Sequence, residues 1–327
     1  MRDAVHWFAI VAGIAVTACA PLHGDKASRS DSPPYFLLTW GKKGEGPGEF
    51  RSPIGIAISR KDEIFVAEFN GSRVQKFDTK GKYLGQFPVV EHPGGIAVGR
   101  DGRVYVTAMQ TPEVYVYDAS GSFLSKWGKA GTGEGEFDKP GGVTVGLDGS
   151  IYVADQGNNR VQHFTPDGQC LGQWGGHGRE PGKFGGGDKP KSRFGGPHFL
   201  AFDREGNIYT TEATDGRIQK LTVEGVPLLA WGDNTTRLGS FGGRPKNIRT
   251  PLPGPIAVCV DHRNRVWVSS TNNRIQIFST NGQYLFGFGG DGDQPGQFNL
   301  PHGIAVDSKG SMYVVDASNQ RIQKFAP

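Results

Sequence analysis

Three histidines next to prolines are the residues of this sequence whose types and positions could do chemistry. His198 and His302 each directly follow a proline, and His92 stands just before Pro93. Imidazole is a common zinc ligand, and a catalytic zinc site uses three protein ligands and keeps one position open for substrate. If these side chains converge, they predict a metal site with one position open for a substrate. The alternative is that they are polar residues bonded to water, and the sequence favours it because Gly94, not histidine, follows Pro93.

A repeated pattern of short strands positions these histidines. Each copy has a proline, a short apolar strand, a turn, a second strand and a residue, usually arginine, that opens a third strand. The prolines are Pro53, Pro93, Pro140, Pro197, Pro253 and Pro301. Their spacing, from 40 residues (53 to 93) to 57 residues (140 to 197), is typical of propeller blades. The residue after each proline should reach a central channel: Ile54, Gly94, Gly141, His198, Gly254 and His302.

The sequence therefore predicts an all-β fold over residues 35–327, a six-bladed β-propeller of four-stranded antiparallel blades. The sixth copy stops after its third strand, residues 321–325, whereas residues 35–40 precede the first copy and have the pattern of a single fourth strand. If residues 35–40 complete the last blade, the ring closes and leaves no free sheet edge.

The copies resemble the NHL repeat. The resemblance rests on residues 155–162 (DQGNNRVQ) and 316–323 (DASNQRIQ), and on the Trp-Gly…Gly-Glu-Phe stretches at 40–50 and 127–137. It covers residues 35–325 and implies a propeller of the bacterial exported type. More distantly, the chain is similar to the peptidyl-hydroxyglycine amidating lyases, which are NHL propellers that use Pro-His pairs to hold zinc. That similarity implies a metal role for His198, His302 and His92.

The arginines that open the third strands are expected to serve the fold. They are Arg73, Arg160, Arg217, Arg274 and Arg321, and the acidic residues near the ends of the second strands are Glu68, Asp155, Glu212 and Asp316. Residues that recur with the blade most simply bond turn backbone or join adjacent blades. Blade two departs from the pattern, with Glu113 in place of the arginine and Ala108 in place of the acid.

Two long loops distinguish the connections into blades four and five. Residues 175–196 carry five Lys/Arg against two Asp/Glu, and residues 232–252 carry four against one, so each loop has a net charge of +3. We expect them to form a ligand face with the channel mouth, because clustered charge attracts anionic partners. The ligand-binding residues predicted there are Arg179, Lys189, Lys191, Arg193, Arg244, Lys246 and Arg249. The alternative is that both loops are merely solvated.

Residues 1–18 predict an export signal of the lipoprotein type. The apolar run 5–16 is too short to span a membrane as a stable helix. Small residues precede Cys19, which we predict to be lipidated and to become the new N-terminus; an ordinary secretory signal is the alternative. Residues 19–34, rich in Ser, Asp, Lys and Pro, predict a solvated tether. The expected location is the cell envelope, lipid-anchored on the periplasmic or outer-membrane side.

These features favour a monomeric binding module for a protein, peptide or anionic ligand. A net charge of +4 is too small to indicate nucleic-acid binding, and none is expected. The alternative is a zinc- or calcium-dependent lyase or hydrolase of the amidating type that uses His198 and His302. Phosphate-loop, nucleophile-elbow and His-Glu-x-x-His motifs are absent from the sequence, so no further catalytic residue is assigned. Cys170 and Cys259 are predicted to be buried free thiols.

Overall fold

The computed structural model describes residues 33–186, 195–243 and 254–327, all within one unit, Pro33–Pro327. The predicted signal, the lipidated Cys19 and nearly all of the tether lie outside these residues, as do six of the seven predicted ligand-binding residues: Lys189, Lys191, Arg193, Arg244, Lys246 and Arg249. Within the described part of the chain, no helix has the length and apolar character needed to cross a membrane.

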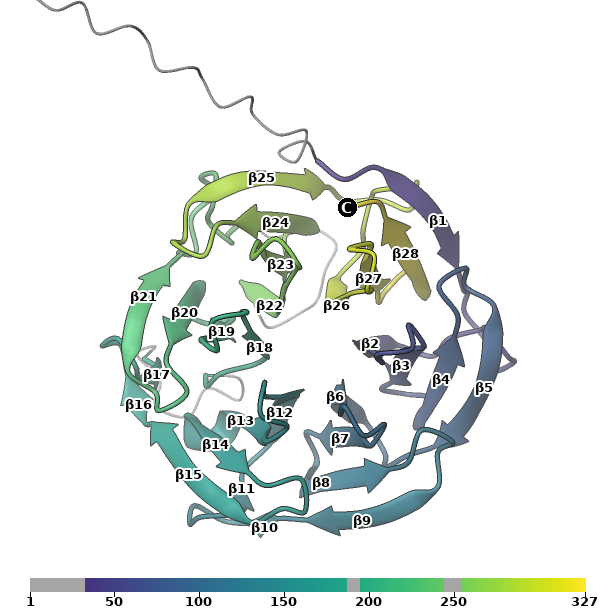
Figure 1. Cartoon of the computed structure of the whole chain (residues 1–327). Coiled ribbons are helices and arrows are strands. Elements are labelled where there is room, and N and C mark those ends of the chain that lie inside the picture. The colour runs from purple at the N-terminus through teal and green to yellow at the C-terminus, as the bar shows by residue number, and fades with distance from the viewer. Residues whose placement is uncertain (1–32, 187–194, 244–253) are drawn as a thin grey trace, which may run out of the picture. The chain divides into compact units, whose positions relative to one another are not determined.

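The described residues form six four-stranded antiparallel sheets around a central channel, as the sequence predicts (Figure 1). Blade one contains β2 (Pro53–Ile58), β3 (Ile64–Glu68), β4 (Arg73–Phe77) and β5 (Tyr83–Pro88). Blade two contains β6 (Pro93–Val98), β7 (Val104–Ala108), β8 (Thr111–Tyr117) and β9 (Phe123–Trp127). Blade three contains β12 (Pro140–Val145), β13 (Ile151–Asp155), β14 (Arg160–Phe164) and β15 (Cys170–Gly175), with a 3-10 turn at Gln156–Asn158.

The other three blades repeat this order. Blade four contains β18 (Leu200–Phe202), β19 (Ile208–Glu212), β20 (Arg217–Leu221) and β21 (Pro227–Trp231). Blade five contains β22 (Pro255–Val260), β23 (Val266–Ser270), β24 (Arg274–Phe278) and β25 (Tyr284–Gly289). Blade six contains β26 (Pro301–Val306), β27 (Met312–Asp316), β28 (Arg321–Phe325) and β1 (Phe36–Trp40). Two short parallel pairs lie in the loops between blades: β10 (Lys129–Ala130) with β11 (Glu136–Phe137), and β16 (His177–Gly178) with β17 (Phe184–Gly185).

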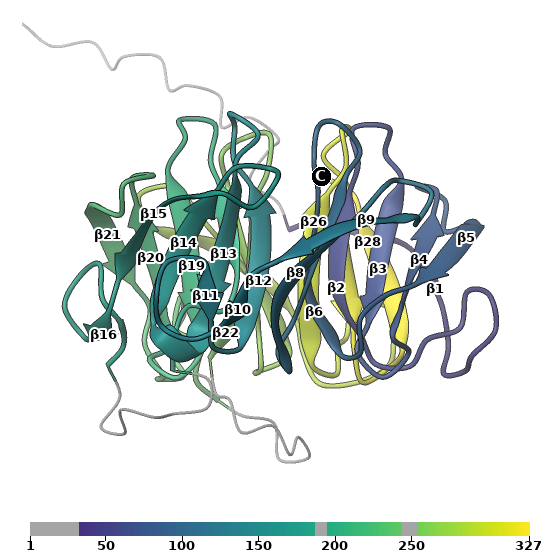
Figure 2. The same ribbon diagram turned by 90° about the horizontal axis from the view of Figure 1, so that it is seen from below.

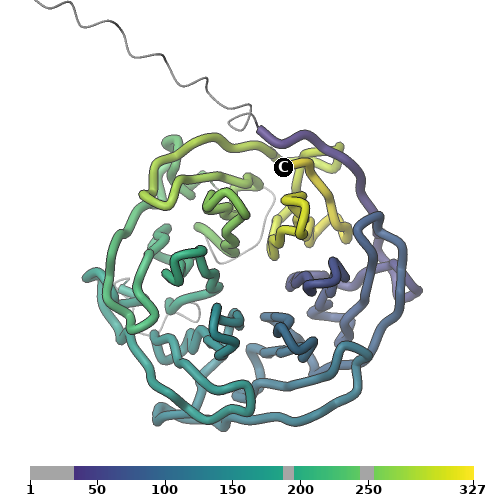
Figure 3. The backbone as a smooth tube through the Cα atoms, in the orientation of Figure 1, coloured from purple at the N-terminus to yellow at the C-terminus, as the bar shows by residue number. Residues whose placement is uncertain are grey.

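Strand β1, from the start of the described chain, is the outer strand of blade six. It pairs antiparallel with β28, with Leu38 opposite Lys324 and Trp40 opposite Ile322. The tube in Figure 3 shows the first and last described segments lying side by side at this blade. The ring thus closes through hydrogen bonds between the two ends of the unit, which leaves β28 no free edge.

The core lies between the blades. One cluster joins Ile56, Val66 and Phe77 of blade one to Tyr313 and Ile322 of blade six, and comparable clusters fill the other junctions. The second strands are buried along their whole length because neighbouring blades cover both of their faces. This explains why these strands are rich in apolar residues and show no regular alternation of buried and exposed positions.

Turn glycines complete the packing between blades. Gly168, at a φ of +88° between β14 and β15, lies against the Trp127 indole that ends the outer strand of blade two. A Cβ atom at Gly168 would come within 2.3 Å of that ring, so both the backbone conformation and the contact require glycine. Gly225 lies against Trp174 in the same way.

The pairing register defines one face of the ring, which we call the proline face because the inner strands begin there. Pro140 lies opposite Asp155, and Asp155 opposite Arg160, so the proline, the acid and the arginine of a blade meet at this face. The side view shows the strands running between the proline face and the opposite one (Figure 2).

The register corrects the predicted start of blade five. Pro255 lies opposite Ser270 as Pro301 lies opposite Asp316, so the strand begins at Pro255 and not at Pro253, which is outside the described residues. The residue after the strand-opening proline is therefore Ile256, which is buried in the core between blades five and six, and not Gly254. The prediction was wrong because the turn after β23 is one residue shorter: four positions separate Ser270 from Arg274, against five between Asp155 and Arg160.

A buried acid–arginine pair joins each of four blades to the loop that leads into it. In blade three, Arg160 Nε donates to Asp155 Oδ2 at 2.7 Å, and Arg160 Nη2 donates to the carbonyl oxygens of Gly133 and Glu136 at 2.7 and 2.8 Å. Gln162 Nε2 donates to the same carboxylate at 3.0 Å. The equivalent pairs are Glu68–Arg73, Glu212–Arg217 and Asp316–Arg321. The predicted structural role is confirmed for these four arginines.

Blades two and five break this network. In blade two, Glu113 accepts hydrogen bonds from Lys126 Nζ and Tyr115 OH, both at 2.7 Å, and these bonds lower its carboxyl pKa. In blade five, Ser270 occupies the position of the acid, and Arg274 is exposed and forms no ion pair with another described residue. The prediction that Arg274 supports the fold was therefore wrong, because the carboxylate that would hold it is missing.

We predict that Arg160→Ala destabilises the protein far more than Arg274→Ala. The first change leaves the carboxylate of Asp155 buried without its cation, which costs about 3–5 kcal/mol. The second removes an exposed side chain with no such partner and should change stability by less than about 0.5 kcal/mol. Urea unfolding of both variants checks this, and equal losses would contradict the assignment.

Candidate ligand face and channel mouth

The residues after the prolines gather at the mouth of the channel on the proline face. A cavity of about 110 Å³ is lined there by Ile54, Gly94, Met109, Gly141, Gln156, His198, Phe199 and His302. Five of these eight directly follow a repeat proline, so the predicted approach to the channel holds for those blades. Gly94 leaves space beside Met109, and Gly141 has no room for a side chain because the carbonyl oxygen of His198 is 2.9 Å from a Cβ atom placed there.

Hydrogen bonds between blades hold the residues of the mouth. The hydroxyl groups of Thr211 and Ser269 donate to the carbonyl oxygens of Ile256 and His302 at 2.7 and 2.6 Å. The amide of Gly142 donates to the carbonyl oxygen of His198 at 2.6 Å. Each bond runs from one blade to its neighbour, so the positions of the two histidines depend on ring closure and not on local sequence alone.

His302 has a neutral imidazole at the mouth. Its ring contacts Phe199 edge to face, with 5.6 Å between the centroids. Burial lowers its pKa to about 4, against the smaller opposing effect of a hydrogen bond with the Ile54 backbone. Its Nδ1 atom is buried and has no hydrogen-bond partner among the described residues. A neutral imidazole with a free ring nitrogen can donate or accept one hydrogen bond to a ligand.

The structure brings two of the three predicted metal ligands to one cavity. His198, which is 7% exposed, and His302 both line the mouth. His92 does not line it; its ring packs on Phe69 with centroids 4.7 Å apart, and its backbone has a φ of +53°. Among the described residues there is no group of three or more His, Cys, Asp or Glu side chains that could hold a metal ion.

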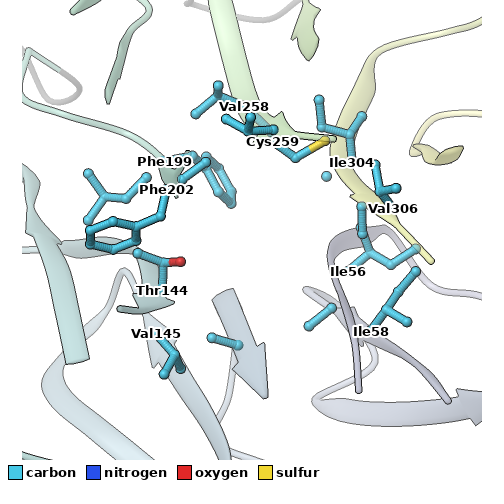
Figure 4. Close-up of a pocket in the computed structure, with 18 of the residues that line it drawn as sticks. Ile56, Ile58, Thr144, Val145, Phe199, Phe202, Val258, Cys259, Ile304 and Val306 are labelled. Carbon is cyan, nitrogen blue, oxygen red and sulfur yellow. The ribbon is translucent and has the colours of Figure 1, made fainter. Parts of the chain in front are cut away.

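Below the mouth, the channel continues as a larger pocket whose lining side chains are mostly apolar. A pocket of about 510 Å³ is lined by side chains from all six blades, and Figure 4 shows Phe199 and Phe202 facing Ile56 and Val306 across it. Cys259 also points into this space, but burial raises the pKa of its thiol well above the usual value. A thiol that stays protonated is a poor nucleophile, so Cys259 serves packing. Both described cysteines, Cys170 and Cys259, are free, as predicted, and are partly buried.

Arg179 is the one predicted ligand-binding residue within the described chain. It is exposed on the loop between blades three and four, next to β16. Its Nε donates to the carbonyl oxygen of Gly186, so the side chain folds back onto its own loop. Its carbonyl oxygen accepts a 2.7 Å hydrogen bond from Arg217, which joins this loop to blade four. Both of these bonds serve the loop: one holds the Arg179 side chain to backbone, and the other ties the Arg179 backbone to the Arg217 side chain.

A polar recess on blade five was not assigned from the sequence. It has a volume of about 150 Å³ and is lined by Thr236, Arg237, Ser240, Gly242, Gly243, Asn272 and Arg274. In the sequence, Arg237 contributes only to the net charge of its loop, and Arg274 has the position of an arginine that supports the fold. The signal that could have found this recess is Ser270, the position at which blade five lacks an acid before its arginine.

Comparison with known proteins agrees with the resemblance seen in the sequence. The NHL repeat model matches residues 50–77, 137–164 and 298–325, which lie in blades one, three and six. The chain is 32% identical over 138 residues to peptidyl-glycine alpha-amidating monooxygenase B of Xenopus laevis, covering 39% of this chain and 15% of that protein. It is 27% identical over 156 residues to NHL repeat-containing protein 3 of Homo sapiens, covering 39% and 45%. The chain thus matches less than half the length of either relative.

Solved structures share the fold at low sequence identity. A Bacteroides thetaiotaomicron protein of unknown function superposes with a TM-score of 0.64 at 19% identity, covering 88% of this chain and 74% of that one. Virginiamycin B lyase from Staphylococcus aureus superposes with a TM-score of 0.56 at 17% identity, covering 84% and 95%. At these identities the likeness shows the propeller architecture and leaves activity open.

We predict that the His302 ring stays neutral from pH 8 to pH 5 and gains its proton near pH 4. An unfolded histidine titrates near about 6.5, so the unfolded chain takes up this proton first as pH falls. The stability contributed by neutral His302 is therefore complete above that value and is lost as pH falls toward 4. NMR titration of the ring Cε1–Hε1 signal, assigned by its loss in His302→Gln, checks this; a midpoint near 6.5 would contradict it.

Proposed function

We propose that this NHL-repeat propeller is a binding module whose ligand face is the proline face. The observation that carries the proposal is the mouth cavity, which combines the neutral His302 imidazole with the apolar side chains of Phe199 and Met109. A recess with apolar walls and a few converging polar groups is the usual form of a ligand site. The residues that differ between blades meet in this recess, whereas the repeated residues hold the loops around it.

The ligand side chain or group that fits this recess is compact and largely uncharged. The side chains that line it include no carboxylate, lysine or arginine. A ligand group entering it would gain apolar contact with Met109 and Phe199 and one hydrogen bond with His302 Nδ1. The loops at 175–196 and 232–252 would add contacts to anionic parts of the same ligand. We therefore propose a protein, peptide or anionic ligand, bound by a monomer.

The location that we propose is the cell envelope. It rests on the apolar run at 5–16, on the small residues before Cys19 and on the polar stretch 19–34. In this proposal the chain is exported, the lipid on Cys19 anchors it to the membrane, and nucleic acid is not a partner.

A second candidate function is a metal-dependent lyase or hydrolase. It is favoured by the meeting of His198 and His302 in one cavity and by the similarity to the amidating monooxygenase over 138 residues. An imidazole pair suits zinc better than calcium, which prefers oxygen ligands. In this candidate the two histidines would hold the ion and water or substrate would complete its coordination.

The test of the binding module fills the mouth without straining the fold. A Cβ atom at Gly94 would lie 3.5 Å from Met109, an ordinary contact, so Gly94→Leu should fold and occupy the recess. Gly172→Leu makes the same change on the outer strand of blade three, where a Cβ atom has no neighbour within 4 Å. Peptides selected from a random display library on the wild-type protein supply the probe. We expect Gly94→Leu to weaken their binding at least tenfold, about 1.4 kcal/mol, and Gly172→Leu to leave it unchanged.

Metal analysis separates the two candidates. The full chain is stripped with chelator and titrated calorimetrically with Zn²⁺, alongside the double variant His198→Ala/His302→Ala. The binding module predicts no stoichiometric zinc uptake that depends on these histidines. One zinc per chain, lost in the double variant, would overturn the binding module in favour of the metal-dependent enzyme. Selected peptides that bind Gly94→Leu as well as wild type would also overturn the binding module at the mouth.

A further inference from the structure

We infer that blade five carries an oxyanion-binding site formed by the guanidinium groups of Arg274 and Arg237 on the proline face. The inference rests on the proposed function, because it gives the ligand of that face a chemical group: a carboxylate or a phosphate. The site is the recess of about 150 Å³ at the junction of the 232–243 segment with the turn between β23 and β24.

Arg274 differs from the equivalent arginines because blade five has no acidic residue to pair with it. Arg73, Arg160, Arg217 and Arg321 keep 10–14% of their side chains exposed and are each paired to an acid that is fully buried. Ser270 stands opposite Arg274 in the strand register where those blades place Glu or Asp. The Ser270 hydroxyl instead bonds Asn272. Arg274 is exposed, and its guanidinium forms no ion pair or hydrogen bond with another described residue.

The recess lies where a guanidinium is bound in blade one. Loops 40–50 and 231–241 have the same length and both run from Trp-Gly to Phe, so Glu45, Gly46 and Glu49 correspond to Thr236, Arg237 and Ser240. In blade one the carbonyl oxygens of Glu45 and Glu49 accept hydrogen bonds from Arg73 at 2.6 and 2.8 Å. In blade five the segment is held instead by two amide side chains: Gln276 donates to the Ser240 carbonyl oxygen at 3.0 Å, and Asn272 donates to the Gly242 carbonyl oxygen at 3.1 Å. The loop therefore has the same length in both blades, but in blade five its described carbonyl oxygens do not bind the guanidinium of the equivalent arginine.

The charge and donors of the recess suit an oxyanion. Arg237 takes the place of Gly46, so blade five adds a second arginine at the same spot, and neither guanidinium is ion-paired to another described residue. No acidic side chain lines the recess. Asp233, on the same loop, accepts hydrogen bonds from the Thr235 side chain, the Ser240 hydroxyl and the Thr235 amide. These bonds lower the pKa of Asp233, and the positive charge of Arg237 adds a smaller effect in the same direction without forming an ion pair. Two guanidinium groups, each with forked donors, match the paired oxygens of a carboxylate or phosphate.

Both arginines are exposed, so the site should bind weakly on its own and should contribute to a larger ligand. Its affinity should fall with added salt, because exposed charges are screened. The oxyanion site lies on the same face as the mouth cavity. It would hold an anionic group of a ligand whose compact, uncharged part occupies the mouth.

The experiment measures binding of two probes to the full chain at low ionic strength: inorganic phosphate, and a short peptide of glutamates with a blocked C-terminus. Isothermal calorimetry gives the affinity of each. We expect millimolar affinity for at least one probe, and the preferred probe identifies the source of the oxyanion as phosphate or carboxylate. Arg274→Ala should weaken binding at least tenfold, and Arg237→Ala should weaken it by a smaller factor.

Two further variants make the test specific. Ser270→Asp restores the acid opposite Arg274, so it should recapture the guanidinium and weaken oxyanion binding as much as Arg274→Ala, while raising stability. Arg51→Ala removes another exposed arginine, paired to Glu45 at 2.9 Å, and should leave binding unchanged. Absence of binding for both probes, or equal weakening by Arg51→Ala and Arg274→Ala, would overturn the inference. The peptide-display experiment with Gly94→Leu tests the mouth cavity separately. The proposed binding module and the oxyanion site can therefore each fail without the other.

Discussion

The buried carboxylate of the second strand is the constraint on which the proline face depends. A charge without solvent access is stable only when a cation and several donors compensate it. In four blades the same arginine, glutamine and backbone amide meet that need. The arginine then reaches further and binds carbonyl oxygens of the loop that arrives from the preceding blade. One electrostatic requirement inside a blade thus ties the loop outside it to that blade.

Blades two and five lack this acid–arginine pair, so their residues at the proline face are not needed to hold an incoming loop in the same way. Blade two replaces the pair by Glu113, Lys126 and Tyr115, and its connection from blade one is short, so no long loop needs to be held. Blade five keeps the loop and the arginine but loses the acid, which converts a framework group into an exposed cation. The mouth varies in the same manner, because Gly94 in blade two leaves space that His302, Met109 and Phe199 border. The binding that we propose at this face therefore uses side chains that the framework does not use.

Much of the architecture could be predicted from the sequence, because each blade repeats the same local sequence pattern. The spacing of the prolines, the apolar second strands and the single strand at 35–40 are local patterns that indicate six blades. The approach of His198 and His302 to one cavity also followed, since both continue a proline at the start of an inner strand. These features depend on residues near each other in the chain.

The remaining features depend on contacts between distant residues. The neutral state of His302 comes from burial beside Phe199, one hundred and three positions earlier in the chain (302 minus 199), and no local pattern reports it. The start of blade five was misplaced because a one-residue shorter turn and an additional proline, Pro255, both fit the repeat. Arg274 is unpaired by an acid because residue 270 is serine. A repeat pattern that is recognised by its arginine does not reveal the missing acid.

Four arginines are held by buried acids, whereas Arg274 is not. Arginine Nε–H spectra of the ¹⁵N-labelled protein test this difference most directly, because a proton that is hydrogen-bonded and buried exchanges slowly with water. We predict that the Nε–H signals of Arg73, Arg160, Arg217 and Arg321 persist at pH 8, whereas the Arg274 signal is lost to exchange and returns in Ser270→Asp. An Arg274 signal as protected as the other four in the unaltered protein would contradict the account.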